Sequence, residues 1–300
     1  MWVVLPQGCT KNDPDSCPSQ RGFTFKTNQS STWESQGLFG LPLEEESLLG
    51  YSGNAEFGFD TITLGWQGSG ALSLMHQVVA GFATKDFYLG NLGLTPRPVN
   101  FTDFNNPQQS VLGTLQNQSK IPGSSWAYTA GASYRKPKTF GSLTFGGYDS
   151  SRSAAGLSFP FGADISRDLT VELQSVTSGT NSLLPNSIIT FIDSTVPHIW
   201  LPLEACSNFE TLFEITWDNA TDLYLVNDTL HDSLVAKNAN ITFTLGRRTS
   251  GGETVDIVLP YGAFDLTITL PSGKTSRYFP IRRAHNDTQF TLGRTFLQEA

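Results

Sequence analysis

The stretch Phe191-Ile192-Asp193-Ser194-Thr195-Val196-Pro197-His198-Ile199-Trp200-Leu201-Pro202 places one carboxylate between two apolar runs. We expect an apolar strand to end at Asp193, followed by a Ser/Thr turn and a second apolar strand. Asp193 would then lie at a strand end in largely dry surroundings, where acid–base chemistry is possible. The simpler interpretation is a turn-forming aspartate, because Asp-Ser-Thr bonds readily to its own backbone. The stretch alone favours the simpler interpretation.

A repeat within the chain changes this balance. Trp2-Val3-Val4-Leu5-Pro6 is similar to Ile199-Trp200-Leu201-Pro202. Phe87-Tyr88-Leu89-Gly90-Asn91-Leu92-Gly93-Leu94 is similar to Phe290-Thr291-Leu292-Gly293-Arg294-Thr295-Phe296-Leu297, with Phe, Leu, Gly and Leu aligned. The tryptophan and the phenylalanine are 85 positions apart in the first copy and 90 in the second. Two matches in the same order at nearly the same separation indicate a duplicated lobe.

The repeat also predicts where a second aspartate would lie. Asp193 is seven residues before Trp200, so its counterpart would be seven residues before Trp2, upstream of Met1. We therefore expect this sequence to lack the N-terminal part of a longer chain, including the first aspartate. No signal peptide precedes Trp2, which supports the same expectation for a protein with secretory features.

These segments resemble those of pepsin-like aspartic peptidases, and they are most similar to the fungal branch. In that family each lobe supplies one aspartate in an apolar-apolar-Asp-Thr/Ser-Gly-Thr/Ser turn, followed by Leu-Trp-Val-Pro or a similar run. Ile192-Asp193-Ser194 resembles the second turn, and Trp2-Val3-Val4-Leu5-Pro6 resembles the run after the first. Gly141-Ser142-Leu143-Thr144-Phe145-Gly146-Gly147-Tyr148-Asp149 is the most specific match, to the family's Gly-Ser-Leu-Thr-Phe-Gly-Gly-x-Asp. Leu292-Gly293-Arg294-Thr295-Phe296-Leu297 is similar to its Leu-Gly-Asp-x-Phe-Leu segment.

The resemblance implies a mostly β, bilobal pepsin-like acid-protease fold with two related lobes, incomplete at both termini. Residues 1–150 would form the N-terminal lobe without its first strands and first Asp turn, and residues 151–300 the C-terminal lobe with Asp193. The implied partner is a peptide or protein substrate in the cleft between the lobes, bound by a monomer. Composition agrees with the fold class, because 21 Phe, 28 Gly and 16 Pro suit short strands and turns.

The chemistry that the resemblance implies needs two carboxylates. They lie so close that they share one proton, and the ionised partner activates the water that attacks the peptide carbonyl. Residues 1–300 supply only Asp193, so we expect this chain as written to be inactive as a peptidase. Two alternatives remain: an incomplete record of an active acid endopeptidase, and an extracellular β-rich binding module of another class.

The turn at Asp193 departs from the family pattern. Thr195 stands where the family has glycine, and Val196 stands where a hydroxyl bonds the carboxylate. The lost bond is worth about 0.5–1.5 kcal/mol. Ser194 keeps the hydroxyl that in the family bonds across to the other lobe. Arg294 replaces an acidic residue, and the sequence assigns it no role.

The family's flap is a hairpin that closes over the substrate and carries a tyrosine. Ser47 to Gly65 is predicted to form two strands, and Tyr51 is the candidate flap tyrosine. The alternative is a tyrosine that packs against a strand. Elsewhere, helices are predicted at Pro107–Gln118 and Pro202–Glu214, and strands at Gln77–Leu94 and throughout Leu223–Pro280.

Several features indicate the secretory pathway, with an extracellular or cell-surface destination. Cys9 and Cys17 are candidates for a small disulfide, and Cys206 is left as a buried thiol. Seven Asn-x-Ser/Thr motifs are candidate glycosylation sites. These begin at Asn28, Asn100, Asn117, Asn219, Asn227, Asn240 and Asn286.

Other functions lack their sequence signals. A formal charge of −8 argues against nucleic acid as a partner, and no apolar run is long enough to form a membrane segment. The chain has no His-Glu-x-x-His, Cys-x-x-Cys or Gly-x-Ser-x-Gly motif, so we expect no metal and no cofactor. His198 is close to Asp193 in sequence, but strand alternation is expected to point it elsewhere, so we interpret it as structural.

Overall fold

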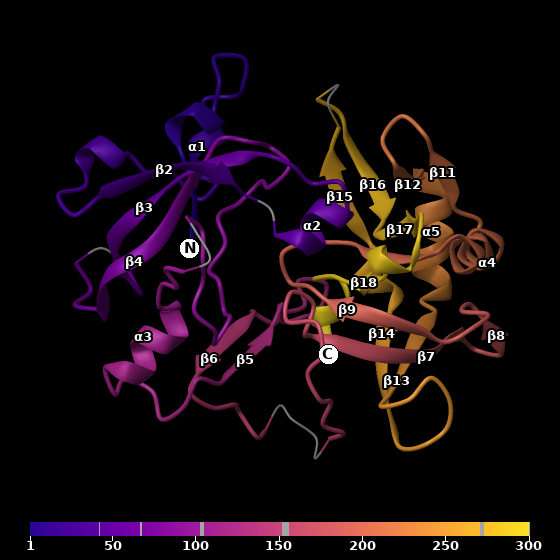
Figure 1. The fold of residues 1–300 in the computed structure, drawn as a ribbon. Helices are drawn as coiled ribbons and strands as arrows, with labels where there is room; N and C mark the ends of the chain where they lie inside the picture. The colour runs from indigo at the N-terminus through magenta and orange to yellow at the C-terminus, as the bar shows by residue number, and fades with distance from the viewer. Residues whose placement is uncertain (42, 67, 103–104, 152–155, 271–272, 300) are drawn as a thin grey trace. The chain divides into compact units, whose positions relative to one another are not determined.

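A computed structural model describes residues 1–300 except 42, 67, 103–104, 152–155, 271–272 and 300 (Figure 1). The chain forms two compact units. The first unit comprises Met1–Ala127 and Thr144–Asp149, and the second comprises Tyr128–Leu143 and Ser150–Ala300. The chain passes between the units within a hairpin of β5 (Trp126–Thr129) and β6 (Ser142–Phe145). The turn-rich stretch after Ser150 lies partly outside the described residues.

The first unit is built on a four-stranded sheet. Its order is β1 (Trp2–Val4), β4 (Ser73–Phe82), β3 (Asn54–Thr63) and β2 (Glu34–Gly40). β1 runs parallel to β4, and the other neighbours are antiparallel. One face of this sheet is covered by α3 (Val111–Asn117), whose Val111, Leu112 and Leu115 pack on strand residues. The predicted helix at Pro107–Gln118 is therefore present, with Ser110 as its N-cap.

The second unit contains an eight-stranded sheet and a four-stranded sheet around one apolar core. The larger sheet has the order β14 (Thr254–Pro260), β13 (Asn240–Gly246), β7 (Thr170–Ser178), β9 (Ile188–Ile192), β18 (Thr291–Leu292), β10 (Ile199–Pro202) and β17 (Ile281–Ala284), with β8 (Asn181–Ser182) beside β7. The smaller has the order β11 (Thr216–Asp218), β12 (Leu223–Val226), β16 (Thr275–Phe279) and β15 (Leu266–Thr269).

The described part of the second unit also has two α-helices, of which the sequence predicted one. α4 (Leu203–Phe213) follows Pro202 and buries Ala205, Cys206, Phe209 and Phe213 on one face. α5 (Asp228–Lys237) interrupts the stretch that was predicted to be strands throughout, so that prediction was wrong there. Its apolar face buries only Leu234, which leaves little helical periodicity in the sequence, and its start depends on the Asn227 cap.

The remaining short elements correct two further predictions. The segment Ser47–Gly65 was expected to hold two strands, but it holds the end of α2 (Glu44–Leu48) and one strand, β3. Three consecutive glutamates are good helix formers, which explains the helix. Gln77–Leu94 was expected to be strands throughout, but β4 ends at Phe82. The other short helices are α1 (Cys17–Gln20), η1 (Pro6–Gly8), η2 (Thr27–Gln29), η3 (Tyr261–Phe264), η4 (Asp287–Gln289) and η5 (Phe296–Gln298).

The two units share a local strand arrangement around their tryptophans. Trp2 is paired in parallel with Ala80 and antiparallel with Asn91. Trp200 is paired in parallel with Arg282 and antiparallel with Thr291. Asn91 is therefore the counterpart of Thr291, so Leu92-Gly93 corresponds to Leu292-Gly293. The sequence alignment was three residues out of register, because the first copy contains two Leu-Gly pairs and only strand pairing distinguishes them.

Candidate functional site

Asp193 owes its position to a strand crossover in the second unit. β9 and β10 follow one another in the chain, but β18 lies between them, parallel to β9 and antiparallel to β10. The loop that joins them, residues 193–198, must therefore cross the end of β18. Asp193 is the first residue of that loop, and Gly293 is the first residue after β18.

The crossing loop is held by three residues after β18. Five consecutive loop carbonyls, those of residues 194–198, accept hydrogen bonds from residues 293–295. The bonds run from the Gly293 N–H to His198 O (3.1 Å), from the Arg294 N–H to Val196 O (2.9 Å), from the Thr295 N–H and Oγ1 to Pro197 O (3.1 and 2.8 Å), and from Arg294 Nη1 to Ser194 O (2.9 Å) and Thr195 O (2.6 Å). Pairing of every carbonyl from residue 194 to residue 198 fixes the path of the loop.

The Asp193 side chain is buried, with 7% of its surface exposed. Its Oδ1 accepts a hydrogen bond of 2.7 Å from the Thr195 N–H, and its Oδ2 has no hydrogen-bond partner in the part of the chain that the structure describes. Burial raises the pKa of Asp193 above its usual range, and the bonds from Thr195 and the charge of Arg294 oppose that rise. The carboxyl group therefore holds its proton more readily than an exposed aspartate and has an oxygen without a partner.

Replacing Asp193 with asparagine is expected to stabilise the protein at neutral pH. A carboxyl whose pKa is raised by folding contributes stability below its unfolded pKa of 3.8, and this contribution is lost as the pH rises through the folded value. The amide keeps an acceptor for Thr195 but cannot ionise. Urea unfolding should show Asp193→Asn more stable than the natural chain near pH 7. Near pH 3 the difference should vanish.

One condition makes that comparison valid. The substitution places an asparagine before Ser194-Thr195, which creates a glycosylation motif, so both proteins should come from a host that does not glycosylate. A variant less stable than the natural chain near pH 7 would show that the ionised carboxylate is favourably paired.

The neighbours of Asp193 show how the altered turn is accommodated. Thr195 does not have a positive φ, so the missing glycine brings no dihedral strain there. Val196 is 1% exposed and stands where the family has a carboxylate-binding hydroxyl. Ser194 is half-buried, and the described residues provide no hydrogen bond to its hydroxyl.

His198 is a packing residue rather than a second acid or base. Its buried ring makes an edge contact with Tyr278, with ring centroids 5.7 Å apart. Burial lowers the pKa of His198 well below its usual range, and the nearby charges of Arg282 and Arg294 act in the same direction. The imidazole is therefore neutral in the fold.

Tyr51, the candidate flap tyrosine, lies in the connection between β2 and β3, just after α2. Its half-buried ring stacks on Phe87 at 5.2 Å and packs against the apolar cluster that includes Val4 and Leu41. This position is the one expected for a tyrosine that packs against a strand.

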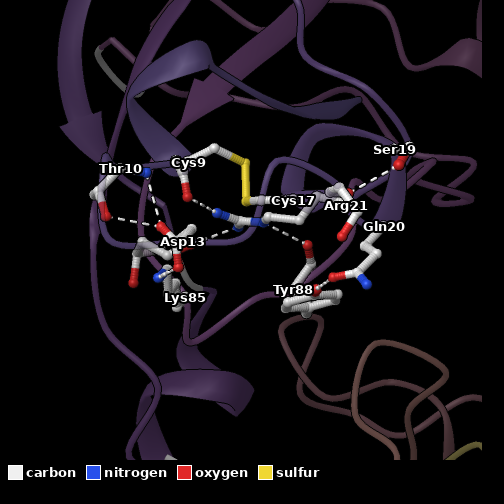
Figure 2. Close-up of a disulfide and its surroundings, with 12 residues drawn as sticks. Cys9, Thr10, Asp13, Cys17, Ser19, Gln20, Arg21, Lys85 and Tyr88 are labelled. Atoms are coloured by element: carbon white, nitrogen blue, oxygen red, sulfur yellow. Dashed lines mark hydrogen bonds and ion pairs between the residues drawn. A yellow bond between two sulfur atoms is a disulfide. The ribbon is translucent and has the colours of Figure 1, made fainter. Parts of the chain in front are cut away.

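A disulfide joins Cys9 to Cys17 in the first unit, and Cys206 is a buried free thiol in the second. Figure 2 shows that Arg21 lies beside the disulfide. The Arg21 side chain is 1% exposed and donates to four backbone carbonyls. The acceptors are Gly8 O (2.7 Å), Thr84 O (2.8 Å), Phe87 O (2.8 Å) and Tyr88 O (2.9 Å). Sequence reasoning missed this residue, because nothing local distinguishes it from a surface arginine.

The candidate glycosylation sites share one property, which is exposure to solvent. The seven asparagines are Asn28, Asn100, Asn117, Asn219, Asn227, Asn240 and Asn286. Among the described residues, no group of three or more His, Cys, Asp or Glu side chains is arranged to hold a metal ion. No helix within the described ranges has the length and apolarity needed to cross a membrane.

Comparison with known proteins identifies the fold. The sequence matches no protein-family model, and no curated protein matches it. Among solved structures, the chain is similar to the crystal structure of the aspartic proteinase from Irpex lacteus. The TM-score is 0.61 at 17% sequence identity, and the match covers 99% of this chain and 82% of that chain. The chain therefore has the mostly β, bilobal pepsin-like fold of that aspartic proteinase.

Proposed function

We propose that residues 1–300 bind peptides at the Asp193 turn and do not hydrolyse them. The observation that supports this most strongly is the setting of the Asp193 carboxyl group. It is buried, one of its oxygens has no hydrogen-bond partner among the described residues, and the neighbouring charge that acts on it is a cation, Arg294. In a catalytic dyad the neighbour would be a second carboxylate.

A single carboxyl group lacks the partner that hydrolysis needs but keeps a means of recognition. Hydrolysis needs one ionised carboxylate to take a proton from water and a protonated one to polarise the peptide carbonyl. A single carboxyl group cannot fill both roles at once. It can still donate to a peptide carbonyl when protonated, or accept from a peptide N–H when ionised. Asp193 is therefore assigned to binding.

The proposed location is the secretory pathway, with the protein outside the cell or at its surface as a monomer. The disulfide between Cys9 and Cys17 requires an oxidising compartment to persist. All seven glycosylation motifs present exposed asparagines, as modification requires. Treatment of the natural protein with an enzyme that removes N-linked sugars should lower its mass.

The binding proposal is tested with peptides from a tryptic digest of casein. The immobilised protein should retain a subset of these peptides, and Asp193→Asn should weaken retention about tenfold, the effect of a lost charged hydrogen bond. Asp256→Asn is the matched control, because Asp256 is exposed on β14 and accepts from Thr244. Mass spectrometry of the same mixtures near pH 4 should find no new peptides. Retention that is absent, or equal in the two variants, contradicts the proposal.

A second candidate is an acid endopeptidase whose other carboxylate comes from outside residues 1–300. The internal repeat favours it. In the second unit β9 lies beside β18, whereas among the described residues of the first unit no strand pairs with the far side of Asn91. Cleavage of casein peptides that Asp193→Asn abolishes would establish this candidate and overturn the first.

A further inference from the structure

Arg294 is the residue near Asp193 whose role the sequence left unassigned. It follows Gly293 at the end of β18 and is half-buried. Its main-chain N–H donates to Val196 O at 2.9 Å, and its Nη1 donates to Ser194 O and Thr195 O. One residue thus binds three successive carbonyls of the loop that begins at Asp193.

One of these carbonyls is coupled directly to the Asp193 carboxyl group. Ser194 O and the Thr195 N–H belong to the same peptide unit, which is planar. Arg294 Nη1 holds the oxygen of this unit at 2.9 Å, and Asp193 Oδ1 accepts from its N–H at 2.7 Å. The plane cannot rotate without breaking both bonds. Fixing the carbonyl therefore fixes the N–H that orients the carboxyl group.

The bonds from Arg294 are also of a strong kind. A guanidinium is always charged in proteins, and its hydrogen bonds to neutral acceptors are stronger than those between two neutral groups. Val196 has no hydroxyl to offer Asp193, so the turn lacks the side-chain bond expected at that position. Arg294 supplies a bond from a different segment of the chain instead.

We propose that Arg294 is the positioning residue of the Asp193 carboxyl group, acting through the peptide unit between Ser194 and Thr195. The inference deepens the proposed function and rests on it, because it concerns the group that would contact the peptide. Arg294 is not assigned any contact with the peptide itself. Its positive charge also opposes the rise in the pKa of Asp193, and it acts on the pKa values of His198 and Tyr128.

The test compares Arg294→Met and Arg294→Lys with the natural protein, using NMR on the complete chain. Two quantities are measured: the hydrogen-exchange rate of the Thr195 amide, and the pH titration of the Asp193 carboxyl carbon. Arg294→Met should speed exchange at Thr195 about tenfold or more, because the peptide unit loses a charge-assisted bond. The pKa of Asp193 should rise in the same variant. Arg294→Lys should keep the pKa near its natural value but leave exchange faster, because an ammonium lacks the planar fork.

An arginine that binds backbone elsewhere in the second unit should affect neither the exchange of Thr195 nor the titration of Asp193. Arg247→Met is the matched control, since Arg247 also binds backbone, at Ser158 O, but lies on a different loop of the second unit. It should change neither quantity. A folded Arg294→Met with unchanged Thr195 exchange and unchanged Asp193 titration overturns the proposal. If Arg294→Met does not fold, unchanged Thr195 exchange in Arg294→Lys overturns it equally. Neither readout involves a peptide, so failure of this inference is distinct from failure of peptide binding.

Discussion

Replacing Gly293 with alanine is expected to destabilise the protein by about 3–5 kcal/mol, among the largest effects of a single substitution. A Cβ at this position would lie 2.3 Å from His198 O, 2.6 Å from Val196 O and 3.0 Å from His198 N. All three atoms are backbone, so no side-chain rotation relieves the overlap. The loop that begins at Asp193 would have to move away from residues 293–295 and lose several of its hydrogen bonds. The cause is steric, because Gly293 does not have a positive φ.

The first unit supplies a matched control for this substitution. Gly93 is the counterpart of Gly293 in the strand register, it has no positive φ, and a Cβ there would meet nothing within 4 Å. Gly93→Ala should change the free energy of unfolding by no more than about 0.5 kcal/mol. Urea denaturation of both variants measures the contrast. Equal effects of the two substitutions would show that Gly293 is not a point of close approach.

Replacing Arg21 with methionine is expected to destabilise the first unit by about 4 kcal/mol or more. Four backbone carbonyls, on segments up to 67 positions away from Arg21 in the sequence, would lose their donor. A buried acceptor left unsatisfied costs about 1–3 kcal/mol. Methionine fills a similar volume, so the lost free energy of unfolding comes from the missing hydrogen bonds and not from a cavity. Lysine should restore little of it, because one ammonium cannot reproduce the geometry of a guanidinium fork.

Urea denaturation measures the loss in free energy of unfolding. Amide exchange in β3 and β4 of the folded protein shows where the loss occurs. The amides of the first unit should lose protection in Arg21→Met, because the disulfide loop and residues 84–88 are no longer tied together. The control is Arg247→Met, which removes an exposed arginine. An Arg21→Met protein within about 1 kcal/mol of the natural chain would mean that water replaces the lost donors.

The fold could be predicted from sequence where the signal is local. α3 and α4 each place apolar residues three or four positions apart, and both were predicted, although α3 begins at Val111 rather than at Pro107. α5 was missed because one buried leucine sets no periodicity. The duplicated lobe was visible, but its register was not. Leu89-Gly90 is the better match in sequence, because Phe87 and Leu94 also align, and only the pairing of Trp2 with Asn91 shows that Leu92-Gly93 is the structural counterpart.

The candidate site likewise has features that follow from local sequence and contacts that do not. The apolar strand before Asp193 and the turn after it follow from neighbouring residues, and burial of the carboxyl follows from them. The contacts of Arg294 with Ser194 and Thr195 join positions 100 and 99 apart in the sequence. Arg21 likewise finds its acceptors through tertiary structure. Arg21 lies in no local motif and Arg294 departs from the one that it lies in, so only the folded chain shows what each of them binds.

The most direct test of the central claim is the shape of the Asp193 titration curve, followed by carboxyl-carbon NMR from about pH 2 to pH 8. A carboxyl group without a carboxylate neighbour titrates in one step. We predict a single step in residues 1–300, with a midpoint above the ordinary 3.8 because burial raises the pKa. Two coupled carboxyls give two separated steps at each site. A two-step curve for Asp193 would reveal a second acid beside it and contradict the assignment of this turn to binding without hydrolysis.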